Sequence, residues 1–101
     1  MVQINSIYVN DGQTVVTLFV GNDNKVMYVV NDVATSSRQV FELGIEPSPQ
    51  LQEEIATGAQ KVWAGQQDLY YLRLFSLSKE LCQFILHCWH EVRKREKKLF
   101  V

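Results

Sequence analysis

The side chains best suited to chemistry are His87, His90 and Glu91, which lie three and four positions apart in a stretch with helical periodicity. Residues at these spacings are neighbours on a helix, so the three groups could share a metal ion. The order His-Cys-Trp-His-Glu matches no zinc-hydrolase helix signature, and spacing identifies no further ligand. We therefore favour a solvent-exposed helix face and predict no metal site. A small enzyme or metal protein centred on His87 and His90 is the alternative.

No other motif fixes a reaction. The sequence contains no Gly-x-Ser-x-Gly elbow, phosphate-binding loop or dinucleotide fingerprint. Cys82 and Cys88 lie on the same predicted helix, where their Cα atoms would be about 9 Å apart along the axis, too far for a disulfide. We expect no catalytic residue and no cofactor, and we predict free thiols in a reducing cytoplasm.

The chain becomes strongly basic near its end. Such a run could neutralise phosphates, which makes a nucleic-acid-binding accessory protein one alternative. At about 100° per residue, however, these side chains scatter around a helix, so we favour a solvated helix end. Arg95 falls on the apolar stripe, which suggests that the helix has left the body of the protein by that point. The basic residues are Arg93, Lys94, Arg95, Lys97 and Lys98.

The helix that positions these groups, about 77–98, has more apolar surface than one small core requires. A stripe about 100° wide is the ordinary pattern of a helix packed on a core. Cys82, Leu86 and Trp89 lie beside that stripe and widen the apolar sector to about 200°. We predict that Trp89, Leu86 and Cys82, with Tyr70 and Tyr71, form a protein interface. An upstream loop folded over Trp89 and Leu86 is the alternative.

The first half of the chain, about 2–44, has the pattern of β-strands separated by turns. The strands are predicted at 2–9, 14–20, 25–30 and 39–43, with hairpin turns at 10–12 and 21–24 that are rich in Asn, Asp and Gly. This pattern is typical of an antiparallel meander. The runs 14–20 and 27–30 are almost continuously apolar, as in strands covered on both faces. Either a helix and a second protomer, or a helix on each face, would provide that cover.

The second half is predicted to be mainly helical. Ser48 and Pro49 form a helix start signal, and a short helix is expected at about 49–64. The segment 68–75 alternates as a strand does but also suits a helix, and we favour a fifth strand. Ser76 or Ser78 is expected to cap the last helix. The chain is thus predicted to be one α+β domain over 1–101, with an antiparallel four- to five-stranded meander sheet packed by a short helix and a long C-terminal helix.

Composition narrows the classes of function. The 101 residues are 47% hydrophobic with a net charge of −1, which gives no overall field to attract nucleic acid. No stretch is long enough to span a bilayer, so we expect no membrane partner. We predict a small, cytoplasmic, non-catalytic interaction module (an adaptor, inhibitor or ligand-sequestering protein) that self-associates through the C-terminal helix and the sheet face. The partner is expected to be a second copy or another protein.

Overall fold

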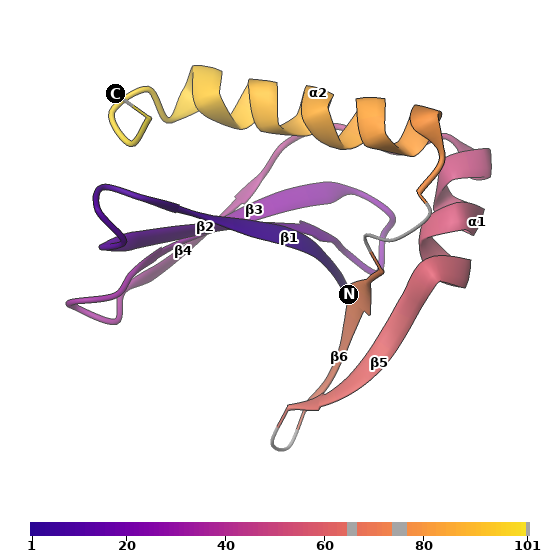
Figure 1. Cartoon of the computed structure of the whole chain (residues 1–101), viewed down its shortest axis with the longest axis horizontal. Helices are drawn as coiled ribbons and strands as arrows, with labels where there is room; N and C mark the ends of the chain where they lie inside the picture. Colours follow the sequence, from indigo (N-terminus) through magenta and orange to yellow (C-terminus); the bar gives the residue numbers. More distant parts are fainter. Residues whose placement is uncertain (65–66, 74–76, 101) are drawn as a thin grey trace.

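The computed structural model of the chain describes residues 1–64, 67–73 and 77–100, with the backbone alone at 62–64 and 67–69. Its elements follow one another in an α+β order, as predicted (Figure 1). They are β1 (Val2–Val9), β2 (Thr14–Val20), β3 (Val26–Asp32), β4 (Arg38–Glu42), α1 (Pro49–Gly58), β5 (Ala59–Ala64), β6 (Gln67–Leu72) and α2 (Lys79–Arg95).

The strands form one six-stranded sheet in the order β4-β3-β2-β1-β6-β5. The predicted meander is confirmed for β1 to β4, whose neighbours are antiparallel. The expectation of a purely antiparallel sheet of four to five strands was wrong, because β6 pairs with β1 in parallel and brings β5 with it. The sheet is therefore mixed.

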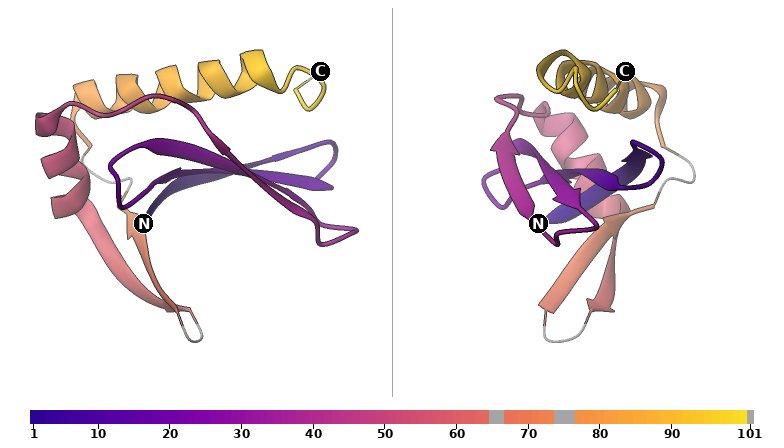
Figure 2. Two further views of the ribbon diagram at one scale, coloured as in Figure 1. Left: turned by 180° about the vertical axis from the view of Figure 1, so that it is seen from behind. Right: turned by 90° about the vertical axis from the view of Figure 1, so that its left-hand side faces the viewer.

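The two helices occupy different places around the sheet. Figure 2 shows α2 lying across one side of the meander, α1 standing at its end, and the β5–β6 hairpin projecting from the sheet. Side chains of α2 and of the sheet face beneath it form the hydrophobic core, to which α1 contributes Ile55. At the centre of this core lie Val16, Leu18, Val26, Tyr28, Leu81, Cys88 and Val92, each 2% exposed or less.

Helix α1 begins where the sequence predicts and ends earlier. The Ser48 hydroxyl accepts a hydrogen bond from the Leu51 N–H at 3.3 Å, and Pro49 occupies the first turn. The expected helix over 49–64 is corrected to 49–58, because Gly58 weakens the helix and the next residue, Ala59, adopts an extended backbone. Residues 59–64 then pair with β6, so the gain from sheet pairing overrides the helical periodicity of this segment.

The uncertain segment 68–75 is a strand over the part that belongs to β6. The strand favoured for this segment is confirmed for residues 68–72, which lie in Gln67–Leu72, and is wrong for Arg73, which follows the end of β6. The predicted residues 74 and 75 lie outside the described part. Tyr70 and Leu72 point to one side of β6, and Tyr71 points to the other. Leu72 belongs to the core, so Tyr71 lies on the side of the sheet away from it.

Helix α2 is capped by Ser78, one of the two predicted caps. The Ser78 hydroxyl accepts a hydrogen bond from the Leu81 N–H at 3.1 Å and donates one to Glu54 Oε2 at 2.7 Å. The backbone N–H of Ser78 donates to Glu54 Oε1 at 2.8 Å, so the α1 carboxylate fixes the start of α2. The predicted helix over 77–98 is therefore shorter at both ends, since α2 covers Lys79–Arg95.

Arg95 overturns the expectation that the helix has left the protein body at this point. Its guanidinium donates hydrogen bonds to the backbone carbonyls of Glu42 at 2.9 Å and Leu43 at 2.8 Å. The side of α2 that faces the sheet therefore extends to Arg95, the last residue of the helix, whose long side chain reaches the end of β4.

Candidate protein-interaction site

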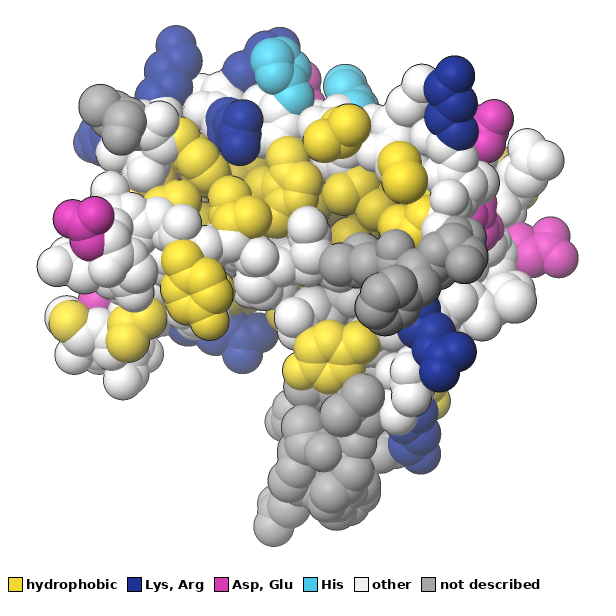
Figure 3. Space-filling model, in the orientation of Figure 1, with side chains coloured by type: hydrophobic (Ala, Val, Ile, Leu, Met, Phe, Trp, Pro, Cys, Tyr) yellow, Lys and Arg dark blue, Asp and Glu magenta, His cyan; other side chains and the backbone are white. Residues whose placement is uncertain are grey.

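A groove lies between α2 and the neighbouring strand β1. It encloses a hollow of about 300 Å³. Figure 3 shows hydrophobic side chains gathered in a band between these two elements, with Lys, Arg and His side chains along α2 above it. The lining residues, which we call the α2–β1 groove, are Asn5, Ile7, Leu86, Trp89, His90 and Arg93.

A β-bulge in β1 shapes the floor of this groove. Gln3 pairs with Phe19 and Asn5 pairs with Leu18, so Ile4 is an extra residue in β1. Because of this extra residue, both Ile4 and Asn5 turn toward α2: Ile4 is buried in the core, and the Asn5 side-chain oxygen accepts a hydrogen bond from Trp89 Nε1–H at 3.0 Å. The bulge thus supplies a polar partner for the buried indole.

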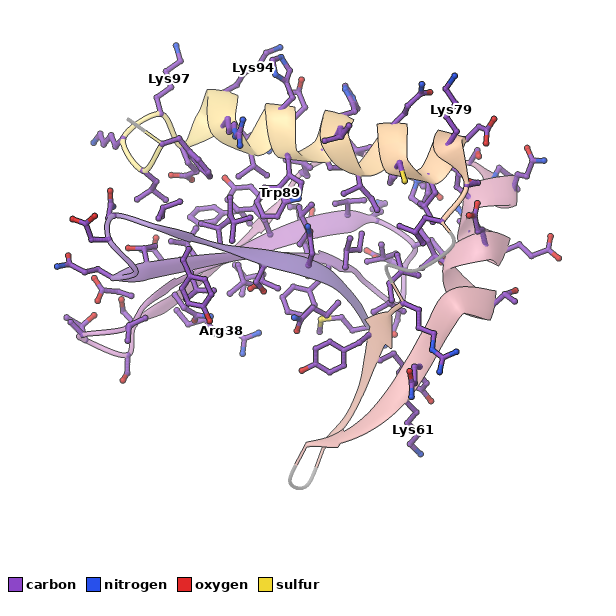
Figure 4. The ribbon with its side chains drawn as sticks, viewed as in Figure 1. Arg38, Lys61, Lys79, Trp89, Lys94 and Lys97 are labelled. Atoms are coloured by element: carbon purple, nitrogen blue, oxygen red, sulfur yellow. The ribbon has the colours of Figure 1, made fainter. Side chains whose placement is uncertain are left out.

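The apolar residues predicted beside the α2 stripe occupy different environments. Trp89 is only 8% exposed and points from α2 toward the sheet (Figure 4). Leu86 is 68% exposed, the largest value among the hydrophobic residues of α2 that the structure describes, and Cys82 is also exposed. Trp89 therefore forms a wall shared by core and groove, whereas Leu86 presents its side chain to solvent.

The other two predicted interface residues lie away from the groove, on β6. Tyr70 is 38% exposed, and Tyr71 is half-buried on the opposite side of the strand. The structure does not bring them together with Leu86. Their role in an interface stays a prediction.

The second notable surface is the side of the meander away from α2, which we call the far face. Phe19 and Val29 are buried there, at 8% and 1% exposure, yet neither belongs to the core cluster under α2. Tyr8 and Val40 on the same face are 72% and 54% exposed. No described helix packs on this face (Figure 2), and Tyr8 and Val40 leave apolar side chains open to solvent there.

The charged residues of the far face are at one edge. On β4, Val40 pairs with Val29, which places Arg38, Val40 and Glu42 on the far face by the alternation of a strand. Figure 4 shows Arg38 on the side of the sheet away from α2. The edge of the face thus carries one cation and one anion on either side of Val40.

The candidate metal residues lie on the solvent side of α2. His87 and His90 are exposed, and Glu91 is half-buried, with its Oε1 at 3.3 Å from Lys94 Nζ. Among the residues described, no group of three or more His, Cys, Asp or Glu side chains is arranged to hold a metal ion. Glu91 thus has a lysine partner beside the two imidazoles.

The basic residues at the end of α2 do not act as one set. Arg95 is engaged with the β4 carbonyls, and the guanidinium of Arg93 lies 5.6 Å from the centre of the Phe100 ring, a cation–π contact. Lys94, Lys97 and Lys98 are exposed. Nucleic-acid binding by these side chains stays a prediction, with Arg95 unavailable to it.

The two thiols, both free, differ in environment. Cys88 is fully buried, and burial, with a smaller contribution from the nearby Glu91 carboxylate, raises the pKa of its thiol to about 12. Cys82 is exposed. Because the thiolate is the reactive form, we predict that one thiol per native chain reacts rapidly with an aromatic disulfide reagent near pH 8, and the second only after unfolding. The absorbance of the thiol released from the reagent measures the number of fast-reacting cysteines. Two fast-reacting thiols in the native wild type, or one in native Cys82→Ser, would contradict the prediction.

Sequence reasoning missed Asn5 and Ile7 in the groove, and Val40 and Tyr8 on the far face. The alternation of Ser6, Tyr8 and their neighbours could have indicated the exposed side of β1. The bulge at Ile4 has no sequence signal, and it decides which side Asn5 takes.

Comparisons with known proteins found no relative: no protein-family model, no curated protein and no solved structure matches the chain. In the described part of the chain, no helix has the length and apolar character needed to cross a membrane. Function must therefore be inferred from the surfaces of this chain.

Proposed function

We propose that this protein is a small non-catalytic interaction module that self-associates through the far face of its sheet. The observation that carries the proposal is on the far face, where Val40 is 54% exposed beside its buried pairing partner Val29, and Tyr8 is 72% exposed on β1. Exposed apolar patches on a small domain commonly mark protein contacts. A second protomer here would cover Val40 and Tyr8, the exposed apolar side chains of this face.

The charges on the far face support a second copy as the occupant. A two-fold contact places the same surface on both partners, so each residue must suit what it meets across the axis. Arg38 and Glu42 lie on either side of Val40 on β4. When two copies of β4 approach in antiparallel orientation about Val40, Arg38 of one copy comes opposite Glu42 of the other. The face is therefore self-complementary in charge as well as apolar.

The test is the native mass by light scattering on a sizing column. We expect a dimer for the wild type and a monomer for Val40→Lys, because two like charges would be buried at the centre of the contact. Val33→Lys is the matched control: Val33 is an equally exposed valine at 58%, located in the β3–β4 turn. We expect this control to remain a dimer.

A monomeric wild type over the accessible concentration range would refute self-association. Dissociation of both variants to the same extent would show that added charge, rather than the position of Val40, controls assembly. Equal unfolding midpoints for the two variants establish that a loss of mass is not a loss of fold, which is expected because both side chains are exposed.

We also propose a cytoplasmic location. The proposal is supported by two free thiols on α2, a feature typical of proteins that work in a reducing compartment.

A further inference from the structure

Among the residues that the structure describes, β1 has no pairing strand at one edge along most of its length. It pairs with β2 from Val2 to Val9, but on its other side β6 pairs only with Val2 and Gln3. Within the described residues, positions 4–9 therefore have a sheet neighbour on one side alone. Alternate residues of a strand turn their N–H and C=O groups to opposite sides, so this edge has donors and acceptors that no described strand pairs with.

The open edge lies directly beside the α2–β1 groove. Ile7 belongs to both, since it is a residue of the unpaired stretch and lines the hollow with Leu86 and Trp89. A strand added to this edge would direct every second side chain toward α2. The hollow of about 300 Å³ has room for one or two such side chains, and exposed Leu86 would close over them.

The charged side chain that lines the groove is a cation, Arg93, and the imidazole of His90 lines it as well. His87 and Lys94 on α2, and Lys97 just after its end, are exposed. Of the acidic residues of α2, Glu91 is already paired with Lys94. Figure 3 shows this row of basic and imidazole side chains above the hydrophobic band. A partner with carboxylates on the side facing α2 would complement this rim.

These features together identify one occupant. We propose that the α2–β1 groove binds an extended, acidic segment of another protein, which adds to the sheet as a strand along residues 4–9 of β1. Backbone hydrogen bonds to the open edge hold the segment, an apolar side chain fills the hollow beside Ile7, Leu86 and Trp89, and a carboxylate lies against Arg93. This surface is separate from the far face, so the proposal does not depend on self-association.

The probe is a display library of random twelve-residue peptides, selected on the whole protein and counter-selected on Leu86→Lys. We expect the recovered peptides to alternate apolar residues with Asp or Glu. A synthetic copy of one of them should bind the wild type at least about tenfold more tightly than it binds Leu86→Lys or Arg93→Glu, as measured by titration calorimetry. Val40→Lys on the far face should bind as the wild type does.

Two further measurements separate the parts of this proposal. Two N-methylated peptides are compared, one methylated at the odd-numbered and one at the even-numbered backbone nitrogens. Because the peptide must donate its N–H groups to the edge of β1, one of these two frames of methylation should abolish binding. Affinity should also fall with rising salt, and less so for Arg93→Glu.

Any of three results with the peptides would overturn the proposal: recovered peptides that are not acidic, no peptide that distinguishes wild type from Leu86→Lys, or full affinity in both N-methylated frames. A wild-type dimer that Leu86→Lys dissociates and Val40→Lys does not would also overturn it, since the groove would then hold a second copy. Because Leu86 is exposed, we expect Leu86→Lys to keep the wild-type unfolding midpoint. Measuring this midpoint shows that lost binding is not caused by misfolding.

Discussion

Replacing Trp89 by alanine is expected to lower the free energy of unfolding by about 3–5 kcal/mol, the usual range for removing a large buried aromatic side chain. Trp89 is 8% exposed and belongs to the core cluster, so its removal leaves a cavity between α2 and β1. It also removes the indole donor that bonds to Asn5 at 3.0 Å. Denaturant unfolding followed by far-ultraviolet circular dichroism measures the change.

Leu86→Ala is the matched control for this prediction. Leu86 lies three residues before Trp89 on the same helix but is 68% exposed, so we expect a change within about 0.5 kcal/mol. A loss below about 1 kcal/mol for Trp89→Ala would mean that the indole contributes little to the core. Trp89→Phe keeps most of the packing and isolates the hydrogen bond to Asn5, which we expect to contribute about 1 kcal/mol.

The second large effect is expected at Tyr28, the largest fully buried side chain among those described. Its ring stacks on Phe41 with the ring centres 5.1 Å apart, and its hydroxyl donates to Glu96 Oε1 at 2.9 Å. We expect Tyr28→Ala to cost about 3–5 kcal/mol through the lost packing. Tyr28→Phe keeps the ring and should cost less, about 1.5–3 kcal/mol, the contribution of a hydrogen bond to a charged group. Equal costs for the two variants would contradict this division.

The Tyr28 hydroxyl also makes the free energy of unfolding depend on pH in the alkaline range. Burial, together with the Glu96 carboxylate, raises the pKa of Tyr28 from 10.0 to about 12. Both the folded and the unfolded chain keep the proton below pH 10, so the contribution is fully present there. Above pH 10 the unfolded chain releases the proton first, and the contribution is lost as the pH rises through about 12. The thermal unfolding midpoint should therefore fall less steeply over this pH range in Tyr28→Phe than in the wild type. The buried Cys88 thiol, whose pKa is also raised, accounts for part of the decline that remains in the variant.

Local sequence signals predicted the parts of the fold that depend on neighbouring residues. The four strands of the meander, the turn at Asn10–Gly12 and the caps at Ser48 and Ser78 all follow from residue type and spacing. In each case the backbone conformation is decided within a few residues by turn preference, alternation or a capping hydroxyl.

Long-range pairing could not be predicted in the same way. Residues 59–64 have helical periodicity, and only the neighbouring β6 makes them a strand. The parallel contact of Val2 and Gln3 with Tyr70 and Tyr71 joins segments almost 70 positions apart, for which a single sequence contains no signal. These two facts account for the sixth strand and for the mixed sheet.

The candidate surfaces could be predicted only in part, because they too depend on contacts between distant segments of the chain. The helical wheel identified a widened apolar sector on α2, but the angle alone could not separate Trp89 from Leu86. Their difference in exposure arises from the sheet beneath, where the bulge at Ile4 turns Asn5 toward the indole. The open edge of β1 likewise follows from the strand order, since among the described residues β6 pairs with β1 at Val2 and Gln3 alone.

The order of the elements has a consequence for synthesis on the ribosome. The meander is complete at Glu42, whereas α2, which covers its apolar face, begins only at Lys79. The nascent chain therefore emerges with Val16, Leu18 and Val26 in an uncovered sheet face until α2 has been translated. Uncovered sheet faces and free strand edges promote aggregation. During synthesis this sheet face is thus exposed to aggregation for longer than it would be in a domain whose covering helix comes first.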